Sequence, residues 1–110
     1  NLKPYLSILF YIMEKLPKGW ELIEEFEGSY VFENAKLNFS VNIDFEELLA
    51  TPYRIEFLHT KGYLKLVNFD DGVYKVNALN EAEAFLKALQ MMTFINKNIQ
   101  WLVSTQSKSS

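Results

Sequence analysis

The chain has 110 residues, no cysteine and a formal net charge of −3. This length fits one domain around one hydrophobic core, and 49% hydrophobic with 23% charged residues is typical of a globular chain. The absence of cysteine excludes disulfides, thiol nucleophiles and cysteine-based metal sites, and it agrees with a cytoplasmic location. The negative charge argues against a nucleic-acid partner, because such binding needs clustered Lys and Arg.

The first predicted element is a helix over residues 4–16, which Pro17 and Gly19 end. Its apolar residues form one face, but Phe10 extends the apolar character to the other side. We therefore expect this helix to be buried on two sides or to take part in an interface. The apolar run 5–13 is too short to span a bilayer, which takes about 20 residues.

Alternating apolar and polar residues predict five or six strands in the middle of the chain. The candidates are residues 20–26, 30–33, 37–45, 53–59, 63–69 and 73–76. Glu27-Gly28 and Asp70-Asp71-Gly72 are turn signals between them. The alternation in the first candidate places Glu24 on its otherwise apolar face, so Glu24 is predicted to point inward.

A short helix is predicted over residues 44–50. Asp44 is a suitable N-cap, and Glu46 and Glu47 would lie near the positive end of the helix dipole. Thr51-Pro52 ends the segment, because a residue before proline avoids the helical region.

The longest helical pattern covers residues 77–104 and contains neither Gly nor Pro. Asn80 and Glu83 form a capping-box pattern at its start. An apolar stripe long enough to cover a sheet includes Phe85, Ala88, Leu89, Met92, Ile95, Ile99, Leu102 and Val103. Asn96 lies within this stripe, so its amide is expected to be hydrogen-bonded if it is buried. Leu86, Phe94 and Trp101 fall on the opposite side of this helix.

These elements predict an α+β fold with a single antiparallel sheet of five or six strands. An N-terminal helix, a short middle helix and a long C-terminal helix would pack mainly on one face. Residues 1–104 would form the domain, and residues 105–110 a disordered polar tail. The element order resembles that of small acidic secretion-chaperone-like domains, and this resemblance implies a dimer that binds client segments.

The sequence contains no phosphate-binding loop and no nucleophile-elbow motif. His59 is the only histidine, and a metal site would need several converging ligands. A single histidine at a strand end is more often a surface or turn residue than a catalyst. We therefore predict a non-enzymatic protein with no catalytic residues, no cofactor and no metal.

The predicted function is that of a protein–protein interaction module, chaperone- or adaptor-like, that self-associates as a homodimer. Large apolar side chains on the outer sides of helices are typical of interfaces, and the candidates are Leu86, Phe94, Trp101 and Phe10. The alternative explanation of the two aromatic residues on the last helix is that another helix of the same chain covers them.

Two other functions remain open. An acidic face could let a small viral or mobile-element protein inhibit a host factor, and its candidates are Glu21, Glu25, Glu33, Glu46 and Glu47. A small-ligand-binding or enzymatic domain could instead use the concave face of the sheet together with Glu24, the one acid predicted to point inward.

Overall fold

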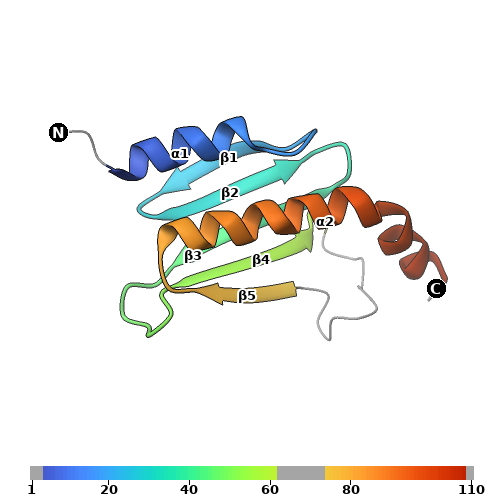
Figure 1. Ribbon diagram of the computed structural model, residues 1–110. Coiled ribbons are helices and arrows are strands. Elements are labelled where there is room, and N and C mark those ends of the chain that lie inside the picture. Colours follow the sequence, from blue (N-terminus) through green and yellow to red (C-terminus); the bar gives the residue numbers. More distant parts are fainter. Residues whose placement is uncertain (1–3, 62–73, 109–110) are drawn as a thin grey trace.

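The computed structural model describes residues 4–61 and 74–108, with side chains described over 9–61 and 75–100 and at Leu102. The elements in chain order are α1 (Pro4–Glu14), β1 (Glu21–Phe26), β2 (Ser29–Asn34), β3 (Phe39–Phe45), β4 (Tyr53–His59), β5 (Tyr74–Ala78) and α2 (Glu81–Lys108) (Figure 1). They form a small single α+β domain, as the sequence pattern predicts.

The five described strands form one antiparallel sheet in the order β1-β2-β3-β4-β5, so each strand pairs with its neighbours in sequence (Figure 1). The turn between β1 and β2 shows how the sequence specifies this meander. Glu27 and Gly28 both have positive φ, 49° and 89°, as a two-residue hairpin turn requires. A Cβ atom at Gly28 would also lie 3.2 Å from the ring of Phe45. Glycine therefore meets both requirements of this position, the positive φ and the limited space beside the ring.

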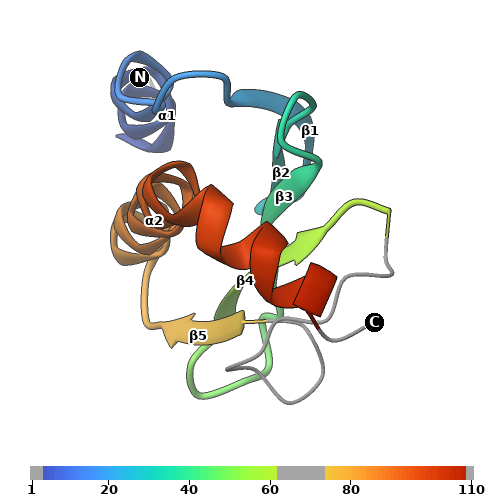
Figure 2. The same cartoon turned by 90° about the vertical axis from the view of Figure 1, so that its right-hand side faces the viewer.

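Both helices lie on the same face of the sheet (Figure 2). The long helix α2 packs across β3, β4 and β5, and α1 lies beside it. The predicted packing of a helix on one face of an antiparallel sheet is therefore confirmed for the long C-terminal helix, and α1 lies beside that helix.

The core lies between α2 and the sheet. Phe39, Val41 and Ile43 of β3 are fully buried, as the alternation in that strand predicts. The ring of Phe85 on α2 lies 4.8 Å from Tyr30 and 6.5 Å from Phe32, measured between centroids. Burying one large apolar side chain contributes about 1.5–3 kcal/mol, so this layer is the main source of stability.

The start of α2 carries the predicted cap. The Asn80 side-chain oxygen accepts a 2.9 Å hydrogen bond from the Glu83 backbone N–H, and the Glu83 carboxylate accepts one of 2.9 Å from the Leu79 N–H. Further along, the backbone departs from helical geometry at Asn98. The Asn98 amide donates to the Phe94 carbonyl at 2.8 Å, and such side-chain competition for an i−4 carbonyl bends helices.

Two side-chain amides hold the connection between α1 and β1. The carbonyl of Lys18 accepts hydrogen bonds from Asn96 at 3.1 Å and from Asn34 at 3.5 Å. The indole N–H of the buried Trp20 donates to the Asn96 oxygen at 2.9 Å. The expectation that Asn96 is hydrogen-bonded is thus confirmed, and this residue joins α2 to the start of β1.

The middle helix predicted over residues 44–50 is not formed. Asp44, its expected N-cap, instead pairs with Arg54 in the ladder between β3 and β4. Residues 46–52 form a closed connection, in which the Glu46 N–H donates to the Pro52 carbonyl at 2.7 Å. So few residues between two paired strands cannot offset the cost of helix nucleation. The element order that suggested the secretion-chaperone-like resemblance therefore lacks its middle helix.

The other boundaries lie close to the predicted ones. The strand predicted over residues 63–69 falls outside the described residues, and the next one is present as β5. The helix α2 continues to Lys108, and it thus includes residues 105–108 of the predicted polar tail.

Candidate interaction surface

The only histidine lies in the core. His59 is buried, its ring packs edge-on against Phe39 with centroids 5.2 Å apart, and its Nδ1 accepts a 3.3 Å hydrogen bond from the Lys61 N–H. Burial, and to a smaller extent the charge of Lys61, lowers the pKa of His59. Among the described residues, no group of three or more His, Asp or Glu side chains could hold a metal ion.

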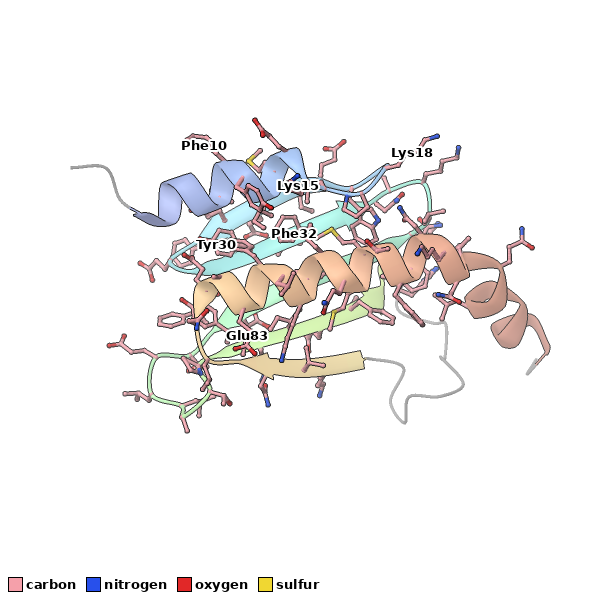
Figure 3. All side chains as sticks on the ribbon, viewed as in Figure 1. Phe10, Lys15, Lys18, Tyr30, Phe32 and Glu83 are labelled. Carbon is pink, nitrogen blue, oxygen red and sulfur yellow. The ribbon has the colours of Figure 1, made fainter. Side chains whose placement is uncertain are left out.

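Over residues 9–13, the helix α1 buries some of its apolar side chains and leaves others in solvent. Leu9 and Ile12 are buried, whereas Phe10 is 65% exposed. Figure 3 shows Phe10 on the side of α1 away from α2. Tyr11 and Met13 are exposed as well. The apolar residues of this helix thus divide between the core and an open surface.

The candidates on α2 have different environments. Leu86 is 55% exposed, so α1 leaves it uncovered. Phe94 is 37% exposed, and its ring centroid lies 6.1 Å from that of Phe57 in β4. Phe94 therefore lies at the rim of the core rather than on the outer side of the helix. The side chain of Trp101 lies outside the described residues.

A β-bulge corrects the prediction for Glu24. The pairing of β1 with β2 shifts between Leu22 and Glu24, so Ile23 is the additional residue of the bulge. Beyond the bulge, Glu25 pairs with the buried Tyr30, which places Glu25 rather than Glu24 on the helix-covered side. Glu24 is exposed on the other face, so the residue on which the ligand-binding alternative depended does not point inward.

The five acidic candidates occupy separate places. Glu21 and Glu33 pair directly across β1 and β2. Glu33 also pairs with Ser40 at the opposite end of β3 from Glu46 and Glu47, and the intervening strand is about 17 Å long at 3.3 Å per residue. Together with the position of Glu25 beside Tyr30, this arrangement means that the five acids do not form a single face.

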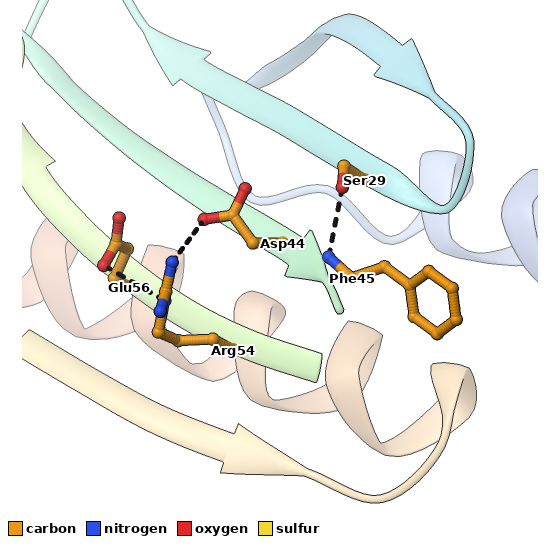
Figure 4. Close-up of polar contacts among 5 residues, drawn as sticks. All are labelled: Ser29, Asp44, Phe45, Arg54 and Glu56. Carbon is orange, nitrogen blue, oxygen red and sulfur yellow. Dashed lines mark hydrogen bonds and ion pairs between the residues drawn. The ribbon is translucent and has the colours of Figure 1, made fainter. Parts of the chain in front are cut away.

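On the outer face of the sheet, charged side chains of β3 and β4 form ion pairs with one another. Figure 4 shows Arg54 between Asp44 and Glu56, with N–O distances of 3.5 Å and 3.8 Å. The Ser29 hydroxyl accepts a 3.1 Å hydrogen bond from the Phe45 N–H at the same end of the sheet (Figure 4). Exposed pairs of this kind contribute little stability, but they engage Arg54, which follows the connection 46–52 by two residues.

A second group of exposed apolar side chains lies at one end of the sheet, and sequence analysis did not single it out. Leu48 is 93% exposed in the connection between β3 and β4, Leu79 is 64% exposed between β5 and α2, and Phe26 is 67% exposed at the end of β1. The bulge accounts for Phe26, since it reverses the phase of the strand. Leu48 was missed because residues 44–50 were predicted to form a helix. The available signal was Thr51-Pro52, which limits that segment to a length typical of a loop.

None of the helices in the described part of the chain combines the length and apolar character needed to cross a membrane. The chain matches no protein-family model, no curated protein and no solved structure.

Proposed function

We propose that this chain is a chaperone- or adaptor-like protein–protein interaction module that self-associates through the outer side of its helix layer. One observation carries the proposal. Large apolar side chains remain exposed on both helices, Phe10 on α1 and Leu86 on α2, although the core beneath these helices is already filled. Aromatic residues are enriched at interfaces, and apolar side chains that gather in an exposed patch mark interaction sites.

Packing of the core does not require large apolar side chains at these two exposed positions. Ala84, Phe85, Ala88 and Met92 already fill the side of α2 that faces the sheet. Leu86 therefore contributes little to folding, and its replacement is expected to leave the fold intact. The same holds for Phe10, since Leu9 and Ile12 are the buried residues in the described part of α1. These two positions can thus report on association separately from folding.

The test is the solution mass by light scattering over a concentration series, for the wild type and for Phe10→Glu/Leu86→Glu. We expect the wild type to form a dimer and the variant a monomer with an unchanged circular dichroism spectrum. Leu48→Ser/Leu79→Ser is the matched control, because it removes exposed apolar surface at the end of the sheet. A wild type that is monomeric at every concentration, or a variant that remains dimeric, contradicts the proposal.

A further inference from the structure

The end of the sheet where β1, β3 and β5 finish carries a surface that the helix layer does not use. In an antiparallel meander, the turn 27–28, the connection 46–52 and the connection 79–80 lie at the same end of the sheet (Figure 1). We call the exposed part of these connections, together with Phe26 at the end of β1, the sheet-end surface. Its apolar members are Phe26, Leu48, Leu49 and Leu79, all exposed.

Hydrogen bonds fix the segments that present these side chains. The connection 46–52 is closed by the bond from the Glu46 N–H to the Pro52 carbonyl and by one of 3.1 Å from the Leu49 N–H to the Glu46 carbonyl. The Leu79 N–H is held by Glu83. A surface whose backbone is already ordered loses less conformational entropy when it binds a partner.

The charge of the sheet-end surface is negative. Glu27 lies in the turn, Glu46 and Glu47 in the connection beside Leu48, and Glu81 follows Leu79 by two residues. Among the described residues, Arg54 is paired with Asp44 and Glu56, and Lys87 is paired with Glu83 at 3.3 Å. Within the described ranges, no Lys or Arg side chain forms an ion pair with Glu27, Glu46 or Glu47.

Apolar anchors surrounded by uncompensated carboxylates define the chemistry of the complementary partner. It must supply apolar side chains for contact with Leu48 and Leu79, and it must carry Lys or Arg beside them. Four strand spacings separate β1 from β5, which is about 19 Å. An amphipathic helix of about 13 residues has this length.

We propose that the sheet-end surface binds a basic amphipathic segment of a partner protein. The proposal rests on the protein-binding function inferred above, for which it names a second surface and the class of client. It is separate from self-association, because Phe10 and Leu86 lie within the helices, whereas the sheet-end surface is formed by the end of β1 and by the connections that follow β3 and β5. A self-associating adaptor would then offer one such surface on each copy.

The probe is a fluorescein-labelled helical peptide of about 14 residues, with Leu at i, i+3, i+4 and i+7 and Lys elsewhere. The same peptide with Glu in place of Lys is its control. Fluorescence anisotropy is expected to show saturable binding of the Lys peptide and none of the Glu peptide. Raising the salt concentration from about 50 to about 200 mM should weaken binding.

Variants of the protein test where the Lys peptide binds. Leu48→Ser/Leu79→Ser is expected to weaken binding of the Lys peptide at least about tenfold, and Glu46→Gln/Glu47→Gln to reduce its salt dependence. Phe10→Glu/Leu86→Glu should bind it as the wild type does, even where self-association is lost. Since Leu48 and Leu79 are exposed, an unchanged circular dichroism spectrum is expected for their variant.

Four results would overturn the inference. The wild type could fail to bind the Lys peptide, or bind the Glu peptide equally well. The Leu48→Ser/Leu79→Ser variant could retain full affinity. It could instead lose self-association, in which case the sheet-end surface is an interface with a second copy. A loss of self-association confined to Phe10→Glu/Leu86→Glu, without peptide binding to any variant, would leave the proposed function standing and remove only the client site.

Discussion

The Tyr30 hydroxyl donates a 2.8 Å hydrogen bond to the carboxylate of Glu81. This contact ties the second strand of the sheet to the first turn of α2, where a negative charge is favourable. Burial, followed by the hydrogen bond and the charge of Glu81, raises the pKa of Tyr30 well above its usual range. Burial and the same carboxylate also raise the pKa of Tyr53.

Stability is therefore expected to fall at alkaline pH. A tyrosine whose folded pKa is raised stabilises the fold fully below its unfolded pKa of about 10, and this contribution is lost as the pH rises from there toward the folded pKa. Urea midpoints measured from about pH 8 to pH 11 should decline beyond pH 10 in the wild type. Tyr30→Phe should lower stability near neutral pH by about 1–2 kcal/mol and make the alkaline decline shallower.

Tyr11→Phe is the control for this experiment, because Tyr11 is exposed on α1. It should leave both the neutral stability and the alkaline decline unchanged. An equal alkaline decline in wild type and Tyr30→Phe would show that the contact with Glu81 does not couple to folding.

Acidification is expected to destabilise the protein through His59. Its pKa is lowered in the folded state, so the unfolded chain takes up a proton first as the pH falls through about 6.5. The stability contributed by the neutral imidazole is thus present above that pH and is lost below it. Denaturant midpoints should decrease from about pH 7.5 to about pH 5.5, before most carboxylates titrate.

The chain has a single histidine, which makes this decrease assignable. In His59→Gln the midpoint should change little over the same interval, whatever the absolute cost of the substitution. A decrease of the same size in the variant would assign the effect to another group.

The N-terminal cap of α2 is expected to contribute measurably to the stability of the protein. Asn80→Ala removes the acceptor for the Glu83 N–H and should cost about 1 kcal/mol of unfolding free energy. Asn77→Ala is the matched control, because Asn77 is exposed on β5 and its side chain forms no cap. Unfolding in urea followed by circular dichroism distinguishes the two variants, and equal losses would argue against the capping role of Asn80.

Replacing Asn96 is expected to lower the free energy of unfolding, although the residue is only partly buried. Asn96→Ala removes a partner of both the Trp20 indole and the Lys18 carbonyl, and leaving such groups unsatisfied costs about 1–3 kcal/mol. Gln90→Ala on the same helix is the control, since Gln90 is exposed. Tryptophan fluorescence during unfolding should show the difference, and a null effect would mean that water replaces the amide.

The parts of the fold that sequence analysis predicted are those with a strong local signal. The regular alternation of Phe39, Val41 and Ile43 identifies a buried strand, and the pair Asn80 and Glu83 identifies the start of α2. The failures have non-local causes. One added residue at Ile23 reverses the face on which Glu24 lies, and pairing with Arg54 keeps Asp44 in a strand rather than at a helix cap. The contact of Phe94 with Phe57 was not predicted, because it joins elements that are distant in sequence.

The bulge in β1 also bears on how copies of this protein can assemble. β1 is an edge strand of the sheet, and exposed edges are templates for pairing with another chain. The irregular step at Ile23 and the charges of Glu21, Glu24 and Glu25 oppose the approach of a second regular strand. Growth of a continuous sheet from this edge is thereby disfavoured. At this edge, the self-association that we propose is therefore expected to use side-chain contacts rather than added strands.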